Sequence, residues 1–220
     1  MRIAVIGAGP HGLSALKALL QNGIDAQAFE READLGGNWN YGAQTSRVYR
    51  STHLISSKPF TQFPDFPMPD GYPDYPSHFQ VKEYFTSYAR HFGLVEHIRF
   101  DSEVVSVAPV GDGAIWTVTV RDRHSGDLHV EEFDGVVIAN GHNWNPKVPR
   151  YPGQESFGGE IIHSADYKDA DVLRGRRVLV VGAGNTGCDV AVESAQNAAR
   201  TWHSTRRGYY YNPKYLMGRP

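Results

Sequence analysis

Two glycine-rich segments have the residue types and the spacing that bind the phosphates of a dinucleotide. Each follows a short apolar run and precedes a segment with apolar residues at helical spacing. In this context the first glycine permits a tight turn, the second lets a pyrophosphate approach the backbone, and the third lets the helix pack closely on the strand. The N-terminus of the helix adds N–H donors and a positive dipole. The candidate residues are Gly7, Gly9, Pro10 and Gly12 in the first segment, and Gly182, Gly184, Asn185, Thr186 and Gly187 in the second.

The residues that follow the two segments differ in charge. Glu30 ends the second apolar run, where its carboxylate would accept hydrogen bonds from a ribose diol. At the corresponding distance from Gly182 stand Arg206 and Arg207, and guanidinium groups there suit a 2′-phosphate, which favours NADPH over NADH. The alternative is that the arginine pair is simply solvated in a surface loop. Opposite charges imply two different nucleotides, and the usual pairing is FAD on the acidic site and NADPH on the basic one.

The elements that must position these residues form two similar halves. Strand, helix and strand are expected at residues 3–6, 12–22 and 26–30, and again at 176–181, 186–196 and 201–204. Between them we expect an irregular stretch at 36–71, a capped helix from Ser77, a three-stranded antiparallel meander at 104–133 and a strand at 136–139. The predicted fold is α/β, with two Rossmann-like dinucleotide-binding domains and a β-meander insertion. Residues 1–170 would form the FAD-binding domain, and residues 174–220 would begin the NADPH-binding domain.

The composition argues against several classes of protein, namely nucleic-acid-binding, membrane-spanning and disulfide-dependent proteins. The 22 basic and 24 acidic residues nearly cancel, so no net field would gather nucleic acid or an anionic membrane surface. No apolar run approaches the roughly 18 residues that span a bilayer, and no secretion signal is visible, so we expect a soluble, cytoplasmic protein. The lone Cys188 excludes an internal disulfide and a CxxC redox pair. No metal-binding cluster or Ser-His-Asp spacing is evident.

Several further motifs make the sequence similar to that of a known family. Phe157, Gly159, His163 and Tyr167 fit the FxGxxxHxxx(Y/F) signature of the flavin-containing monooxygenases, which the chain resembles along essentially all of its length. The resemblance to the Baeyer-Villiger monooxygenases is more distant. Supporting matches are Gly36–Trp39, Phe63–Pro67, Asn185–Asp189 and Ser204–Gly208.

This resemblance implies a reaction and further site residues. NADPH would reduce FAD, O₂ would add to the flavin as a C4a-hydroperoxide, and that species would oxygenate an amine or sulfide. The cofactor carries this chemistry, so no catalytic side chain is assigned. His163 would couple the two nucleotide domains, or would merely pack in the hinge. Gly37, Asn38 and Trp39 would lie near the flavin and its ribityl chain, although Trp39 is also compatible with the core, and the backbone at Val105 would contact the adenine.

This sequence differs from the pattern of the flavin-containing monooxygenases in three respects. Ile55 occupies the position of a family asparagine near the flavin, and an apolar side chain cannot donate a hydrogen bond to an oxygen adduct. Asn140 replaces the threonine of an Ala-Thr-Gly sequence, which we do not explain. The chain also stops within a family-like segment, so we expect a fragment, or a split protein whose missing C-terminal half another chain supplies; a homodimer is a further alternative.

Two other functions therefore remain open. The protein could be an NADPH oxidase or flavin reductase that does not retain the oxygen adduct. It could also be a truncated, non-catalytic nucleotide-binding module. The sequence does not identify the substrate.

Overall fold

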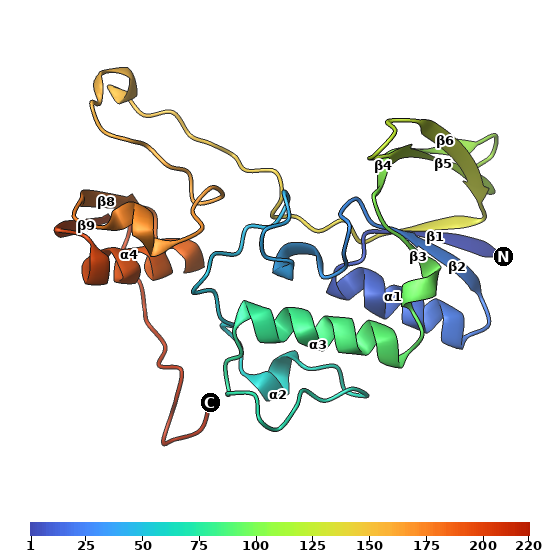
Figure 1. Cartoon of the computed structure of the whole chain (residues 1–220), viewed down its shortest axis with the longest axis horizontal. Helices are drawn as coiled ribbons and strands as arrows, with labels where there is room; N and C mark the ends of the chain where they lie inside the picture. Colours follow the sequence, from blue (N-terminus) through green and yellow to red (C-terminus); the bar gives the residue numbers. More distant parts are fainter. The chain divides into compact units, whose positions relative to one another are not determined.

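The chain forms two compact units in the computed structural model, which describes all 220 residues (Figure 1). The first unit contains Met1–Val48 and His53–Pro146, and the second contains Tyr49–Thr52 and Lys147–Pro220. The short segment 49–52 therefore belongs to the second unit although the chain on both sides of it belongs to the first.

A four-stranded parallel sheet organises the first unit. Its order is β3-β2-β1-β7, so the central strand β1 pairs with both β2 and β7. Helix α1 connects β1 to β2, as a parallel pair requires. The bounds are Arg2–Ile6 for β1, Pro10–Gln21 for α1, Asp25–Phe29 for β2, Ile98–Arg99 for β3 and Gly135–Ile138 for β7.

Strand β1 is buried on both faces, which explains its uninterrupted apolar sequence. Ile3 and Val5 belong to the main core with Leu13 and Leu16 of α1. Ala4, on the opposite face, belongs to a second cluster with residues of the meander. In Figure 1, α1 accordingly lies on one side of the sheet and the meander on the other. Alternate residues of a strand point to opposite faces, so a strand covered on both sides must be apolar at every position.

The longest helix of the first unit, α3 (His78–His91), begins with the capping box that its sequence predicts. The Gln80 N–H donates to Ser77 Oγ, and the Ser77 N–H donates to Gln80 Oε1 at 3.0 Å. The box satisfies two backbone groups that a helix N-terminus otherwise leaves unpaired. The buried face of α3 then joins the main core through Val81, Tyr84, Phe85, Tyr88 and Ala89.

The expected meander is present as three antiparallel strands, β4 (Ser102–Val110), β5 (Ile115–Asp122) and β6 (Leu128–Phe133). The register between β4 and β5 shifts between Val104 and Ser106, so Val105 lies at a bulge. Phe133 closes the second cluster by packing edge-on against Phe29.

The stretch that we expected to be irregular contains two short helices. The 3₁₀ helix η1 spans Gly37–Trp39, and α2 spans Lys58–Thr61. The expectation that residues 36–71 form no regular structure is therefore wrong at these two places. Elements of three or four residues carry no periodic pattern that could have revealed them. Three more 3₁₀ turns are η2 (Val95–His97), η3 (Gln154–Ser156) and η4 (Ala170–Leu173).

The second unit repeats the strand, helix and strand of the N-terminus. Strands β8 (Arg177–Val181) and β9 (Arg200–Ser204) are parallel, and α4 (Asn185–Asn197) connects them. The predicted α/β class and the strand-helix-strand order of both halves are confirmed. On β8, Val180 is buried, whereas Leu179 and Val181 are exposed with Trp202 of β9. None of the helices has the length and apolar character needed to cross a membrane.

Two tyrosines hold helix α4 by its carboxylates. The Tyr49 hydroxyl donates to Asp189, and the Tyr167 hydroxyl donates to Glu193, one turn further along the helix. The two rings pack 5.5 Å apart in a cluster with Leu173. These contacts explain why the segment 49–52 belongs to the second unit.

The unit boundary differs from the domain boundary predicted from the sequence. The units divide at Pro146, whereas we expected the change between residues 170 and 174. The last part of the linker belongs to the second unit because Tyr167 and Leu173 pack in the cluster that borders α4. The assignment of one nucleotide to each part remains a prediction.

Replacing Tyr167 with phenylalanine is expected to lower the free energy of unfolding by about 1–3 kcal/mol at pH 7, because a buried hydrogen bond to a charged acceptor is lost. Burial and the bond to Glu193 raise the pKa of Tyr167 above its ordinary value of 10.0. The folded state thus holds this proton more tightly than the unfolded state. The resulting stability is complete below pH 10 and is lost as the pH rises above it.

Urea unfolding at pH 7 and at several values above pH 10, followed by circular dichroism, measures both effects. The wild type should lose more stability over the alkaline range than Tyr167→Phe. The matched control is Tyr210→Phe, at a fully exposed tyrosine, which should change neither value. Equal stability of the wild type and Tyr167→Phe at pH 7 would contradict this account.

Candidate functional site

The two glycine-rich loops have nearly the same backbone conformation. The first glycine of each has a positive φ, +99° at Gly7 and +108° at Gly182, which favours glycine. Each then donates its N–H to the carbonyl at the end of the neighbouring strand, Gly7 to Phe29 at 2.8 Å and Gly182 to Ser204 at 2.9 Å. The second glycines, Gly9 and Gly184, are the N-cap residues, with φ and ψ equal to within one degree.

The third glycine of each loop is fixed by a close backbone approach. A Cβ atom on Gly12 would overlap the carbonyl oxygen of Gly7, and one on Gly187 would overlap that of Gly182. Both obstacles are backbone atoms, which cannot swing aside as a side chain can. The roles expected of these glycines in the turn and in the packing thus match the geometry of both loops.

Neither helix that follows a loop has a side-chain cap at its N-terminus. The first N–H groups of a helix have no partner within the helix, and they lie at the positive end of its dipole. Pro10 occupies the first turn of α1, where the missing N–H costs nothing. In α4 the first turn begins with Asn185 and Thr186. Both N-termini can therefore bind an anion such as a phosphate.

Glu30 lies directly beside the first loop and is only 5% exposed. Its Oε2 accepts the Ala8 N–H at 2.7 Å, and its Oε1 accepts the Glu32 N–H at 3.0 Å. Burial raises the pKa of Glu30, and these two backbone N–H groups oppose that shift. Each carboxylate oxygen retains a lone pair that could accept a ribose hydroxyl. Glu30 thus braces the loop as well as being available to a ligand.

The Gly-Gly-Asn-Trp motif packs against the first loop. The Gly36 N–H donates to the Ala8 carbonyl at 2.9 Å, and a Cβ on Gly37 would lie 3.1 Å from the Cα of Gly9. The side chain of Asn38 accepts the Arg47 N–H at 2.7 Å, which shapes the following loop. The structure therefore brings Gly36 and Gly37 against the first loop. The expected position of Gly37 and Asn38 near a flavin remains a prediction.

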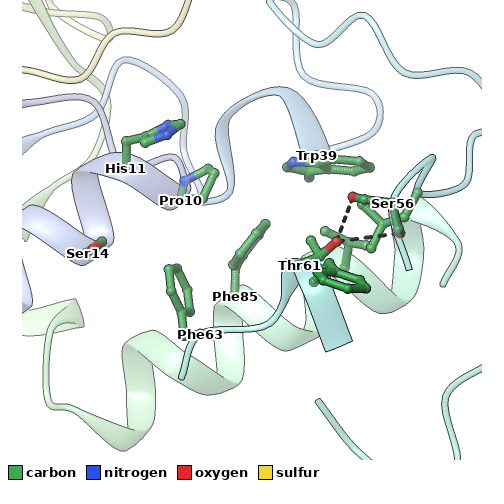
Figure 2. A pocket seen from close by; sticks show the side chains of 11 residues that line it. Pro10, His11, Ser14, Trp39, Ser56, Thr61, Phe63 and Phe85 are labelled. Carbon is green, nitrogen blue, oxygen red and sulfur yellow. Dashed lines mark hydrogen bonds between the residues drawn. The ribbon is translucent and has the colours of Figure 1, made fainter. Parts of the chain in front are cut away.

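A cavity of about 350 Å³ opens between Trp39 and the first turns of α1. Figure 2 shows Pro10 and His11 on one side of it and Trp39 on the other, with Phe63 and Phe85 below them. Trp39 also packs against the main core, as the alternative considered for it expects. A place of Trp39 beside a flavin remains a prediction. Most of the lining is apolar, which suits a planar ring system.

The polar groups at the Trp39 end of the cavity come from Ser56 and Thr61, whose hydroxyl oxygens lie 2.7 Å apart (Figure 2). Ile55, at the family asparagine position, is 64% exposed and does not line the cavity. No periodic signal in the sequence indicated Ser56 or Thr61.

Asn140, the other departure, lies against the first loop. A Cβ on Gly7 would come within 2.7 Å of the Ala139 carbonyl oxygen and 3.4 Å of the Asn140 Cα. The side chain of Asn140 is exposed, and nothing in the structure explains the change from threonine.

Val105 and His163, two further residues predicted from the family resemblance, lie in a strand bulge and in the linker respectively. Val105 lies at the bulge of β4, which leaves its backbone out of the regular pairing. Strand β4 begins beside Glu30, since the Ser102 N–H donates to the Glu30 carbonyl at 2.8 Å. In the second unit, His163 Nδ1 accepts the Ala165 N–H at 3.1 Å, a local bond within the linker. A contact of Val105 with adenine and a coupling role for His163 remain predictions.

Arg206 and Arg207 line a hollow of about 360 Å³ together with Gly182 and Tyr209. The hollow lies beyond the carboxyl ends of β8 and β9, where open α/β sheets bind ligands. Neither arginine forms an ion pair or a hydrogen bond within the chain, and no carboxylate lines the hollow. The structure thus brings the predicted arginines to the second loop, while Tyr209 was not predicted.

The chain matches the model of the family described as flavin-binding monooxygenase-like over residues 1–217. Among curated proteins, it is 40% identical over 216 residues to flavin-containing monooxygenase 5 of *Rattus norvegicus* and to the same protein of *Homo sapiens*. These alignments cover 94% of this chain but 40% of each relative, so the chain spans less than half the length of these proteins.

Solved structures of an S-oxygenase and of a monooxygenase have folds similar to that of this chain. The S-allyl-L-cysteine S-oxygenase from *Allium sativum* superposes with a TM-score of 0.86 at 26% identity, over 99% of this chain and 54% of that one. A cyclohexanone monooxygenase mutant from *Rhodococcus* sp. Phi1, bound to NADP⁺, superposes with a TM-score of 0.76 at 28% identity, over 96% of this chain and 40% of that one.

Replacing Gly12 with alanine is expected to lower the free energy of unfolding by about 3 kcal/mol, because the new methyl group forces α1 away from the Gly7 carbonyl. Gly71→Ala is the control, since Gly71 lies in open space without a positive φ. Its stability should stay within about 0.5 kcal/mol of the wild type. Urea unfolding measures both values, and equal stability of the two variants would show that the close approach is not a constraint.

Proposed function

The chain belongs to the flavin-binding monooxygenase-like family, and from this and its two loops we propose that it binds FAD at the first loop and NADPH at the second. We further propose that the whole protein uses them to oxygenate a nitrogen- or sulfur-containing small molecule. The observation that carries the proposal is that two loops of matching backbone are followed by groups of opposite charge, Glu30 in one case and Arg206 with Arg207 in the other.

The residues of the first loop fit FAD. The uncapped N-terminus of α1 would hold the pyrophosphate, and the free lone pairs of Glu30 would accept the ribose hydroxyls. The cavity beside Trp39 would take the flavin ring, because its walls are largely aromatic and apolar. The hydroxyls of Ser56 and Thr61 would be within the same cavity for polar contacts with the ring.

The residues of the second loop fit NADPH. The N-terminus of α4 would hold the pyrophosphate, and the unpaired guanidinium groups would bind the 2′-phosphate in charge-assisted hydrogen bonds. A similar chain, the *Rhodococcus* monooxygenase, was solved with NADP⁺.

When bound, FAD would supply the redox chemistry that links oxidation of NADPH to reduction of O₂. The side chains of this chain would bind and orient the cofactors and exclude water from the ring. Trp39, Phe63 and Phe85 would provide the dry walls of that site. A sulfide is supported as substrate by the name of the *Allium* relative, an S-oxygenase of S-allyl-L-cysteine.

An NADPH oxidase is the second candidate, favoured by one observation. Ile55 offers no hydrogen-bond donor and is exposed to solvent, so it adds no polar contact to the cavity. If the polar groups of the cavity do not support transfer of oxygen to a substrate, the two electrons of NADPH would instead reduce O₂ to hydrogen peroxide.

The test of the proposed function is the absorbance spectrum of the purified chain with FAD, recorded before and after anaerobic addition of NADPH. We expect a bound yellow flavin that bleaches, because both nucleotides would be held by one chain. A colourless chain that takes up no FAD would overturn the proposal for the first loop. After air is admitted with a sulfide present, sulfoxide supports the monooxygenase, whereas one peroxide per NADPH supports the oxidase.

Replacing both Arg206 and Arg207 with alanine is expected to weaken NADPH binding at least 30-fold and to change NADH binding less than threefold, because only NADPH carries the 2′-phosphate. The control removes two other exposed cations, Lys147 and Arg150, which do not line the hollow. Equal losses for NADPH and NADH, measured by titration calorimetry, would refute the assignment of the arginines.

A further inference from the structure

The hollow of the second unit contains an aromatic ring as well as two cations. Its lining consists of Gly182, Arg206, Arg207 and Tyr209, so Tyr209 is the one aromatic side chain there. A phosphate alone would need only the guanidinium groups and the backbone N–H groups. The tyrosine adds a flat, largely apolar surface, which suits a ligand with a planar ring close to its phosphate.

Tyr209 lines the hollow and is less exposed than the next residue, which does not line it. The Tyr209 side chain is 41% exposed, while that of Tyr210 is fully exposed at 101%. The ring of Tyr209 also lies 6.5 Å from that of Tyr211, in a tilted arrangement. A ring that is partly covered on one side loses less conformational freedom when a ligand binds on the other.

The chemistry of a 2′-phosphorylated nucleotide matches this arrangement. In such a molecule the 2′-phosphate and the adenine are attached to the same ribose. If Arg206 and Arg207 bind that phosphate, the adenine must lie within one sugar of them, and Tyr209 is only two residues beyond Arg207 along the chain. Stacking on an aromatic side chain strengthens the binding of a base by about tenfold or more.

We propose that Tyr209 is a specificity-determining residue of the second site, against whose ring the adenine of the 2′-phosphorylated nucleotide stacks. The inference rests on the proposed function of the second loop and adds a base-recognition residue to it. Arg206 and Arg207 select the phosphate, and Tyr209 selects the ring attached to the same ribose.

The experiment measures binding of adenosine 2′,5′-bisphosphate to the full chain by titration calorimetry. This probe carries both the adenine and the 2′-phosphate. Tyr209→Ala should weaken its binding about tenfold, because the stacking surface is lost. Tyr209→Phe should bind like the wild type, because the ring remains. The matched control is Tyr210→Ala, an adjacent tyrosine outside the hollow, which should also bind like the wild type.

A second probe separates the contribution of the Tyr209 ring to binding from that of the arginine charges. Inorganic pyrophosphate has no base, so Tyr209→Ala should change its affinity less than twofold. The salt dependence gives an independent readout. Tyr209→Ala should keep the wild-type decrease of affinity with ionic strength, whereas Arg206→Ala should reduce that decrease, because screening acts on charges.

The outcomes are distinct. If the wild type does not bind adenosine 2′,5′-bisphosphate, the proposed function of the second loop fails, and the role of Tyr209 fails with it. If the wild type binds and Tyr209→Ala binds equally well, only the stacking proposal is overturned. If Tyr209→Phe loses as much affinity as Tyr209→Ala, the hydroxyl rather than the ring makes the contact, and stacking is again overturned. Circular dichroism of each variant shows that it remains folded.

Discussion

In both glycine-rich loops the carbonyl oxygen of the first glycine lies so close to the third glycine that no side chain fits between them. This approach fixes where each helix begins relative to the strand before it. It also leaves the first N–H groups of α1 and α4 at the carboxyl ends of β1 and β8, without a side-chain cap. The anion-binding geometry of both candidate sites depends on this backbone contact. The charged residues beside each loop would then decide which nucleotide the site prefers.

The adaptation is electrostatic and differs between the two sites. At the first loop Glu30 is buried and accepts two backbone N–H groups, so the negative charge is part of the loop itself. At the second loop Arg206 and Arg207 are exposed and have no acidic partner in the chain, so their charge is available to a ligand. A phosphorylated ribose is repelled by the first arrangement and attracted by the second. Under the proposed function, one backbone plan would thereby support two different selectivities within 220 residues.

The sequence predicted those features that depend on local patterns. Both strand-helix-strand units, the capping box at Ser77 and the meander follow from periodicity and turn residues, and the structure confirms them. The sequence alone could not predict contacts between segments that are far apart along the chain. The hydrogen bond from Tyr49 to Asp189 joins residues far apart in the chain. Because of this contact, segment 49–52 belongs to the second unit. Likewise, Ser56, Thr61 and Tyr209 become site candidates only because segments without a sequence period, loops and the four-residue helix α2, bring them to a cavity.

The most direct test of the central claim, two separate sites with different nucleotide preferences, is native mass spectrometry of the chain mixed with FAD and NADP⁺. The account predicts a ternary species with one FAD and one NADP⁺ per chain. It also predicts that excess NADP⁺ does not displace the FAD. Mutual displacement of the two nucleotides, with never more than one bound per chain, would contradict it.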